Sequence, residues 1–324
     1  MGKVFLDIKD LNIHYITSEA DVYAINDISL TLEKGKTLGL VGETGAGKTT
    51  LARAILGILP KPPAQVLGGK IDFEGQNIFE LSEKEICKIR GDKITMIFQD
   101  PMTALNPVMP VGEQIAEVVA LHNGGSRSDA RKRAIEMLET VGIPAERYVE
   151  YPHQFSGGMK QRVVIAIALA CDPDLLLADE PTTALDVTIQ AQVLELMKEL
   201  NEKNKSSMIL ITHDLGVVAE MCDYVAIIYA GQIVEIGTLE DIFDHPTHPY
   251  TNGLFAALPS MSSGDRLHPI AGMPPDPTNM PKGCYFNPRC PYATDACKQG
   301  VIPMIEISPG HTCKCLIVKE KEAR

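Results

Sequence analysis

The stretch Gly42-Glu43-Thr44-Gly45-Ala46-Gly47-Lys48-Thr49 decides the fold of this chain. It matches the pattern G-x-x-x-x-G-K-[ST], in which glycines let main-chain N–H groups turn toward phosphate oxygens. A short apolar run, Thr37–Val41, precedes it, and Thr50–Leu56 follows with apolar residues at helical spacing. The order strand, glycine loop, helix therefore predicts a phosphate-binding loop rather than an ordinary glycine turn.

The last two residues of this motif carry its chemistry. Lys48 extends a positive charge toward the β- and γ-phosphates of a nucleotide, and the hydroxyl of Thr49 is an oxygen ligand for Mg²⁺. The helix that follows directs its positive end toward the same anion. The sequence therefore predicts that a nucleoside triphosphate and Mg²⁺ bind where the strand Thr37–Val41 ends.

The composition is that of a globular protein without a preference for nucleic acid. The chain has 324 residues, of which 45% are hydrophobic and 22% charged, and its formal net charge is −12. Negative charge opposes a nucleic-acid partner, because such proteins usually present a basic face. No apolar run approaches the roughly 20 residues that cross a bilayer, and no secretory signal is seen. We therefore expect a cytoplasmic protein.

Patterns on both sides of the motif predict an α/β fold built from several parts. Residues 4–41 alternate as strands, which predicts an antiparallel sheet beside the loop. Tyr15 or Tyr23 could stack on a base from there, with Tyr15 preferred, although each could equally be a half-buried strand residue. Asp100–Pro110 is rich in Pro, Asn and Met and predicts a loop, whereas residues 108–170 predict a helical insertion between two strands.

Polar residues follow three predicted buried strands of the core. Gln99 follows the first, Asp179 and Glu180 end the second, and His213 follows the third. Ligands of open α/β sheets bind at the carboxyl ends of strands. There Asp179 can hold Mg²⁺ through water, Glu180 can polarise an attacking water, and His213 can reach a γ-phosphate. Taken alone, His213 is equally typical of a structural turn.

A second element that could face a phosphate begins at Ser156. This residue can cap the helix that follows, and Gly157-Gly158 leaves bare N–H groups at the positive end of that helix. Taken alone, Ser-Gly-Gly is more typical of a simple cap.

Five of the eight cysteines fall between positions 284 and 315, in a proline-rich region that we expect to form a separate C-terminal unit. Zinc sites mostly use closer pairs than Cys284, Cys290 and Cys297, and disulfides are rare in the cytosol. Four thiolates in a segment with few apolar residues suit a [4Fe–4S] cluster, with Zn²⁺ as the alternative.

In order and spacing, these motifs resemble the nucleotide-binding subunit of ABC transporters over residues 4–240. The resemblance implies an α/β fold: a P-loop (RecA-like) core with an antiparallel β subdomain, a helical subdomain at about 108–170 and a small cysteine-rich C-terminal domain. The domains would be residues 1–244 and 245–324. Further segments are similar to the oligopeptide/dipeptide (and nickel) importer branch: Phe98–Pro107, Tyr151–Ser156, Pro181–Ile189, His248–Thr251 and Gly283–Pro291.

The resemblance also implies a role for each motif residue. Catalysis would use Glu180, His213 and Gln99, and Mg²⁺ would be held by Thr49, Gln99 and Asp179. The cluster would be held by Cys284, Cys290, Cys297 and Cys315, with Cys313 as the alternative to Cys315. ATP would be bound by Tyr15, Gly42, Glu43, Thr44, Gly45, Ala46, Gly47, Lys48, Thr49, Thr50, Ser156, Gly157, Gly158 and Asp186.

The implied activity is ATP hydrolysis that powers import of oligopeptides or dipeptides, on the inner face of the cell membrane. The implied partners are a second, similar ATPase subunit in a heterodimer, two transmembrane permease subunits and an extracellular solute-binding protein. Each ATP would lie between the P-loop of one subunit and the Ser-Gly-Gly helix of the other. The alternatives are import of nickel or another solute by the same branch, and a soluble ABC ATPase without a transport role.

Overall fold

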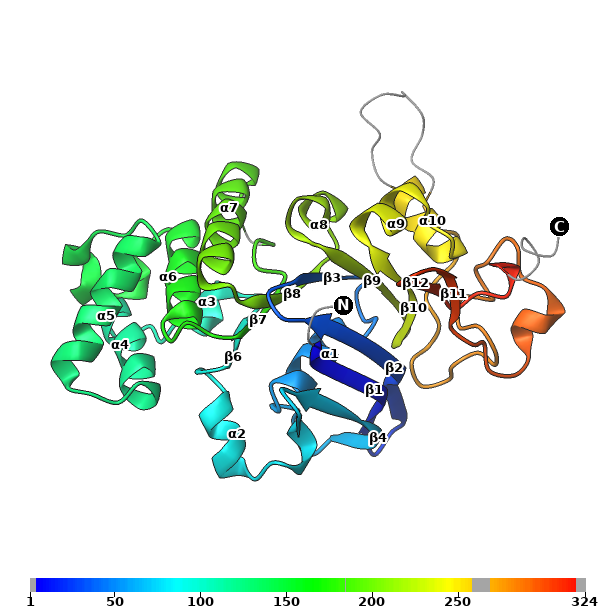
Figure 1. The fold of residues 1–324 in the computed structure, drawn as a ribbon, viewed down its shortest axis with the longest axis horizontal. Helices are drawn as coiled ribbons and strands as arrows, with labels where there is room; N and C mark the ends of the chain where they lie inside the picture. The colour runs from blue at the N-terminus through cyan, green and yellow to red at the C-terminus, as the bar shows by residue number, and fades with distance from the viewer. Residues whose placement is uncertain (1–3, 184, 258–268, 319–324) are drawn as a thin grey trace.

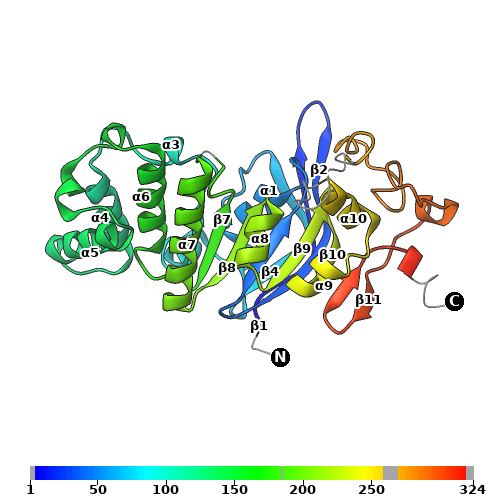
Figure 2. The same cartoon turned by 90° about the horizontal axis from the view of Figure 1, so that it is seen from above.

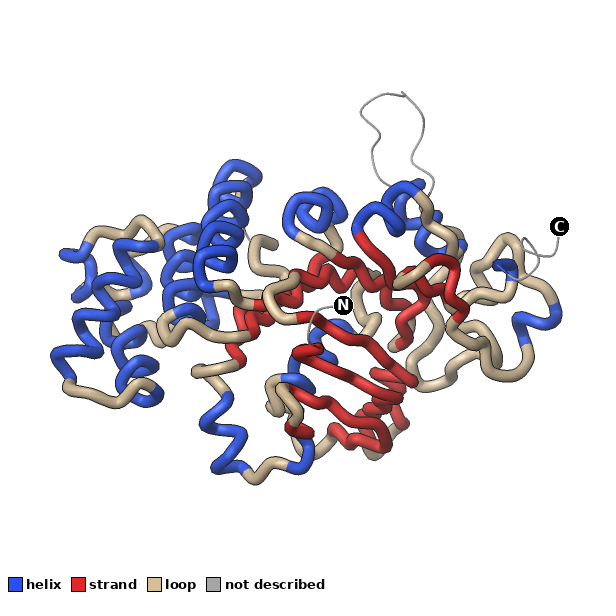
Figure 3. Tube along the Cα trace, viewed as in Figure 1, coloured by secondary structure: helices blue, strands red, loops and turns tan. Residues whose placement is uncertain are grey.

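The computed structural model describes residues 4–183, 185–257 and 269–318. Along the long axis of the molecule, a group of helices lies at one end, two sheets lie in the middle and the cysteine-rich segment lies at the other end (Figure 1). Figure 3 shows that loops dominate this last region, as its proline content predicts.

The larger sheet in the described residues has the strand order β11-β12-β10-β9-β3-β8-β7-β6. The strands from β9 to β6 in this order are parallel, and β10, β12 and β11 are added antiparallel. The bounds are β3 Thr37–Val41, β6 Ile94–Ile97, β7 Leu175–Asp179, β8 Ser207–Thr212, β9 Tyr224–Tyr229, β10 Gln232–Thr238, β11 Ile305–Ser308 and β12 His311–Cys313.

Both faces of the parallel strands are buried. In β7, Leu175 and Leu177 belong to one hydrophobic core, and Leu176 and Ala178 belong to another on the opposite face. Successive strand residues point to opposite faces, so a strand covered on both sides must be apolar throughout. This is why the strands that the sequence predicts as buried read as continuous hydrophobic runs.

A smaller antiparallel sheet has the strand order β2-β1-β4-β5. It packs against the hydrophobic core that contains Leu175 and Leu177. The helix that follows the phosphate loop, α1, lies between the two sheets (Figure 1). Its residues Leu51 and Ile55 are fully buried in the core that the two sheets share. The bounds are β1 Val4–Ile16, β2 Asp21–Glu33, α1 Lys48–Ile55, β4 Ala64–Phe73 and β5 Gln76–Asn77.

A short connection leads from this sheet to β6. It holds the 3-10 turn η1, Ile78–Glu80, and the helix α2, Glu83–Ile89. Ser82 and Glu85 form a capping box at the start of α2, in which each side chain meets the main-chain N–H of the other residue. Two otherwise unpaired N–H groups of the first turn are thereby satisfied.

The helices at one end of the molecule come between β6 and β7 in the chain. They are α3 Pro101–Ala104, α4 Val111–His122, α5 Arg127–Thr140, η2 Ala145–Val149, η3 Pro152–Gln154 and α6 Gly157–Leu169. The sequence prediction of a loop over 100–110 is wrong where α3 forms one helical turn. Proline suits the first position of a helix, because no partner is needed there for its missing N–H.

Further helices lie along one side of the larger sheet, as the view from above shows (Figure 2). They are α7 Val187–Asn204, α8 Leu215–Met221, α9 Leu239–Asp244 and α10 Pro249–Ala256. No helix in the described ranges is long and apolar enough to cross a membrane.

The C-terminal segment returns to the larger sheet. After η4, Asp295–Lys298, the chain forms β11 and β12, and β12 pairs with β10 through Glu235 opposite Cys313. Cys313 therefore lies on the same sheet as β3, the strand that leads into the phosphate loop, next to the edge strand β11.

Candidate functional site

The phosphate loop joins β3 to α1 and closes around its own lysine. Gly47 has φ +100, and a Cβ there would lie 2.4 Å from the carbonyl oxygen of Ala24, so only glycine fits. The Nζ of Lys48 donates to the carbonyl oxygens of Gly42 and Glu43 at 2.8 and 3.0 Å. Burial lowers the pKa of Lys48, although nearby carboxylates oppose the shift.

The hydroxyl of Thr49 donates to the Asp179 carboxylate at 2.8 Å. Asp179 is the last residue of β7 and is 3% exposed. Burial raises the pKa of Asp179, and the hydrogen bond from Thr49 opposes that rise. Two oxygen ligands of the kind that Mg²⁺ prefers are thereby held in contact beside the phosphate loop.

Glu180 lies next to this pair in a strained main-chain conformation, with φ 46. Its carboxylate accepts hydrogen bonds from Gln99 at 3.0 Å and Thr183 at 2.9 Å, and lies 3.3 Å from Nδ1 of His213. Partial burial raises the pKa of Glu180, but the hydrogen bonds from Thr183 and His213 outweigh it, so the net shift is downward. The carboxylate is therefore ionised at neutral pH and able to accept a proton from water.

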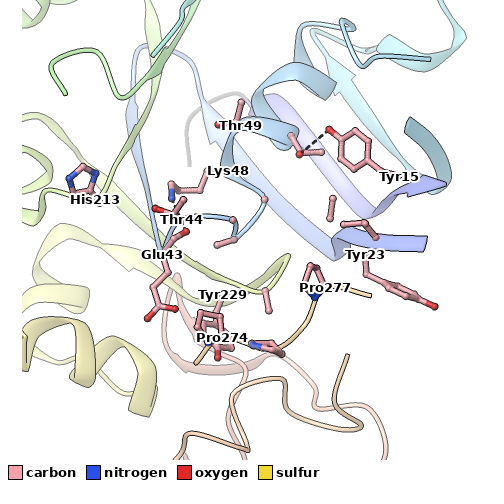
Figure 4. Close-up of a pocket in the computed structure, with 18 of the residues that line it drawn as sticks. Tyr15, Tyr23, Glu43, Thr44, Lys48, Thr49, His213, Tyr229, Pro274 and Pro277 are labelled. Atoms are coloured by element: carbon pink, nitrogen blue, oxygen red, sulfur yellow. Dashed lines mark hydrogen bonds between the residues drawn. The ribbon is translucent and has the colours of Figure 1, made fainter. Parts of the chain in front are cut away.

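One cavity of about 600 Å³ connects these groups. Figure 4 shows Lys48, Thr44 and Glu43 facing it from the loop, with His213 at one side. The lining residues that the sequence singles out are Tyr15, Tyr23, Glu43, Thr44, Gly45, Ala46, Gly47, Lys48, Thr49, Thr50, Gln99, Asp179, Glu180 and His213.

Both candidate tyrosines line this cavity. The hydroxyl of Tyr15 shares a hydrogen bond of 3.1 Å with that of Thr50, which fixes the Tyr15 ring beside the start of α1. Tyr23 instead packs its ring against His14, with centroids 4.4 Å apart.

Other predicted residues do not line the cavity. Ser156 caps α6 by accepting from the N–H of Met159 at 3.4 Å, and Asp186 caps α7 by accepting from that of Ile189 at 3.0 Å. Gly157 and Gly158 begin α6 and do not line the cavity either. Gly42 does not line it, and its carbonyl accepts a hydrogen bond from Lys48.

Sequence reasoning missed part of the lining. From the antiparallel sheet and the hairpin of β9 and β10 it missed small and aromatic residues, and from the C-terminal segment it missed four apolar ones. The proline cluster at 274–277 was visible, but it predicts only a loop. These residues are Val22, Ala24, Tyr229, Ala230, Pro274, Pro275, Pro277 and Met280.

The cysteine-rich segment has a second, small cavity of about 10 Å³, lined by Cys284, Cys290, Cys297 and Cys315 together with His248. This is room for about one water molecule. As they stand, the described residues hold no group of three or more His, Cys, Asp or Glu close enough together to bind a metal ion. The four thiols thus line one cavity, but they do not lie close enough together to bind a metal ion in this arrangement.

The fifth cysteine, Cys313, is fully buried and does not line this cavity. A hydrogen bond from its thiol lowers the pKa of Cys315 to about 7, against the effect of burial. Burial raises the pKa of Cys284 to about 11.

His248 is 1% exposed and faces this cavity. Its Nδ1 accepts from the N–H of Tyr250 at 3.1 Å, so the proton of the neutral ring lies on Nε2. Nothing in the described part of the chain accepts a hydrogen bond from this Nε2.

The parallel sheet, the phosphate loop at its carboxyl edge and the carboxylates at the end of β7 together define a P-loop nucleotide-binding protein.

Comparison with known proteins narrows the class. Residues 25–183 match the family described as ABC transporter, and residues 234–297 match the oligopeptide/dipeptide transporter, C-terminal region. The chain is 53% identical to the oligopeptide transport ATP-binding protein OppD of Bacillus subtilis (strain 168), over 95% of this chain and 87% of that protein. It is 49% identical to the dipeptide transport ATP-binding protein DppD of the same organism, over 99% and 96% of the two chains.

Among solved structures, the chain is similar to the ATP-binding cassette MJ0796 in a dimeric post-hydrolysis state bound to ADP and Pi. The TM-score is 0.65 at 29% identity, over 72% of this chain and 98% of that one. The chain therefore belongs to the ABC transporter family, among the ATP-binding proteins of the oligopeptide/dipeptide type, as its motifs predict. It is accordingly an ATP hydrolase with the α/β fold of that family.

Proposed function

We propose that this protein is the ATP-hydrolysing subunit of an importer of oligopeptides or dipeptides. The observation that carries the proposal is the similarity to OppD, at 53% identity over 95% of this chain. The match of residues 234–297 to the C-terminal region of oligopeptide/dipeptide transporters supports it outside the ATPase core.

In this proposal Lys48 and the N–H groups of the phosphate loop hold the β- and γ-phosphates of ATP. Thr49 and Asp179, in contact at 2.8 Å, would hold Mg²⁺ together with Gln99. When bound, the ion would neutralise charge on the phosphates. Glu180 would accept a proton from the attacking water. Gln99 and His213 position the Glu180 carboxylate, which supports a catalytic role for all three.

Ser156, Gly157, Gly158 and Asp186 are proposed to complete the nucleotide site of a partner subunit. The position of these residues away from the 600 Å³ cavity of their own chain supports this role. The N-terminus of α6 carries the N–H groups and the dipole that suit a phosphate. The partner would be a second, similar ATPase, which makes the assembly a heterodimer.

The remaining partners in the proposal are two transmembrane permeases and an extracellular solute-binding protein, with this chain on the inner face of the membrane. Val108 and Val149 support a protein contact on the helical insertion, because they are 80% and 61% exposed. Val108 lies shortly before Val111 in the chain, and Val149 directly before Glu150. The N–H of Val111 donates a hydrogen bond of 2.9 Å to the carbonyl of Glu150, so the two valines belong to neighbouring segments. The segment that carries Val108 follows Gln99 of the nucleotide site in the chain. In the proposal, this connection transmits a change at the nucleotide to a permease.

We further propose that Cys284, Cys290, Cys297 and Cys315 hold a structural [4Fe–4S] cluster, with Zn²⁺ as the alternative. The four thiols share one cavity, and the buried donor at Nε2 of His248 is left without an acceptor, which sulfur bound to iron could supply. Cys315 fits the set better than Cys313, because Cys313 does not line this cavity. The cavity of about 10 Å³ would have to widen to admit the cluster. Such a group would stabilise a segment with few apolar residues.

The division into residues 1–244 and 245–324 also remains our proposal. The start of the C-terminal region would be α10 and the loops after it, and its end, β12, would anchor it to β10.

The test is uptake in cells that lack this chain and carry it back as wild type or as Glu180→Gln. We expect wild type to restore uptake of labelled dipeptides or oligopeptides and Glu180→Gln to leave it absent, because the amide cannot accept the proton. A matched control is Glu199→Gln, which makes the same change on an exposed position of α7. Restored uptake of Ni²⁺ but of no peptide would overturn the proposed substrate, and full uptake with Glu180→Gln would overturn the proposed base.

A further inference from the structure

The C-terminal region reaches back to the nucleotide cavity. Pro274, Pro275, Pro277 and Met280 line that cavity together with the phosphate loop, although they follow it by more than 220 positions. We call residues 270–281 the proline strap. Figure 4 shows Pro274 and Pro277 along one edge of the cavity, with Tyr15 on another.

The proline strap is held to the antiparallel sheet and contains a hydrogen-bonded turn of its own. The carbonyl of Pro277 accepts a hydrogen bond of 2.8 Å from the N–H of Tyr23 on β2. Asp276 closes a turn by accepting from the N–H and the hydroxyl of Thr278, at 2.8 and 2.7 Å. A wall of proline rings on a closed turn loses little conformational entropy when a ligand packs against it.

Arg289 joins the start of the proline strap to the phosphate loop. Its side chain is 5% exposed, and its guanidinium makes a two-pronged ion pair with the Glu43 carboxylate, at 2.9 and 3.1 Å. Its Nε also donates to the carbonyl of Ala271 at 3.0 Å. One side chain therefore fixes the relative position of the strap and the loop.

The ion pair also sets the charge at the phosphate site. Glu43 is the second residue of the loop and lines the nucleotide cavity. An unpaired carboxylate there would repel the phosphates, and a buried guanidinium at hydrogen-bond distance neutralises it. In contrast to the charged phosphate site, the proline strap presents an apolar surface, which suits the flat face of a base.

We propose that the proline strap is the wall of the nucleotide site that contacts the base, and that Arg289 is the positioning residue that holds it there. ATP affinity then depends on the cysteine-rich region as well as on the P-loop core. The inference rests on the ATP site of the proposed function and adds the segment that contacts the base of the nucleotide.

The test measures binding to the purified full-length protein by calorimetry, with Mg²⁺ and either AMP-PNP or inorganic tripolyphosphate. Tripolyphosphate has the phosphates but no base. Met280→Ala should weaken AMP-PNP and leave tripolyphosphate unchanged, because only the base meets the strap. Arg289→Gln should weaken AMP-PNP by about tenfold, which corresponds to about 1.4 kcal/mol.

A second variant separates the two effects of Arg289. Adding Glu43→Gln to Arg289→Gln removes the unpaired charge, so tripolyphosphate should bind as it does to Glu43→Gln alone. AMP-PNP should stay weaker than for Glu43→Gln alone, because the strap has lost its anchor. Arg133→Gln is the matched control, since Arg133 also pairs with a carboxylate, Asp172, and a main-chain carbonyl, that of Ala170, but lies in the helical insertion.

The inference is overturned if AMP-PNP binds to Arg289→Gln and to Met280→Ala within about twofold of the parent protein. It is also overturned if Met280→Ala weakens AMP-PNP and tripolyphosphate equally. A parent protein that binds neither ligand would contradict the nucleotide site itself, which is a different failure. Far-UV circular dichroism of each variant shows that a loss of affinity is not a loss of folding.

Discussion

Replacing Glu235 should release the C-terminal region from the larger sheet. The carboxylate of Glu235, on β10, is fully buried and accepts three hydrogen bonds from two other segments. Two come from the N–H groups of Thr247 and His248, at 2.7 and 2.9 Å, and one from Nε2 of His311 on β12, at 2.9 Å. One side chain thus joins β10, the start of α10 and the last strand.

The size of the effect follows from the donors left behind. A buried donor without a partner costs about 1–3 kcal/mol. Glu235→Ala leaves three donors without an acceptor, so we expect a loss of about 3–5 kcal/mol in the free energy of unfolding. Glu235→Gln keeps one oxygen and the volume of the side chain, so its loss should be smaller, about 2 kcal/mol.

The assay is urea unfolding followed by far-UV circular dichroism, since the chain has no tryptophan to report by fluorescence. A shift of the midpoint without a change of slope measures a change of stability. Glu199→Ala is the control, because it removes a glutamate from an exposed position of α7. If Glu235→Ala unfolds at the same urea concentration as the parent, or if the Gln and Ala variants are equally damaged, the reasoning from unpaired donors is refuted.

Four further results are expected. Lys48→Ala should lose nucleotide affinity while the fold is retained, because the phosphates lose their cation; unchanged ATP binding in calorimetry would contradict the assignment of the phosphate loop. Gly47→Ala should lower both stability and ATP binding, since its Cβ would meet the carbonyl of Ala24 at 2.4 Å and its φ is +100; a variant with the parent's melting temperature and affinity would refute this. In the proposed assembly each site is completed by a second subunit, so the purified chain alone should hydrolyse ATP slowly and with a specific activity that rises with protein concentration; full activity independent of concentration would rule out a shared site. Protein purified without oxygen should contain iron and sulfide, and Cys315→Ser should lose them while Cys313→Ser keeps them; stoichiometric zinc without visible absorbance, or the reverse order of the two variants, would overturn the proposed ligands.

The sequence predicts the elements whose signals are local. The P-loop, the cap of Ser156 on α6, and the buried strand that ends at Asp179 all lie within a few residues of the groups that stabilise them. Such patterns state the main-chain conformation directly, because glycines, caps and hydrophobic periods act over one or two turns. The ABC transporter family follows from the order of these local motifs, and the comparisons confirm it.

The loop prediction over 100–110 is wrong at α3, and the reason lies in the position of a proline. Proline, asparagine and methionine are typical of loops as a composition, but a proline at the first position also starts a helix, and α3 begins at Pro101. Composition without position could not distinguish the two.

Only the tertiary structure shows that residues of the C-terminal region line the nucleotide cavity. Arg289 and Glu43 are 246 positions apart, and nothing near either residue in the chain signals the other. The same holds for Pro277 against Tyr23 and for the pairing of β12 with β10. Contacts of this kind are set by how the sheets and loops pack, because an ion pair or a cavity wall needs only the right distance and leaves no period in the sequence. The sequence by itself thus determined the phosphate chemistry, and the folded chain decided which other residues surround it.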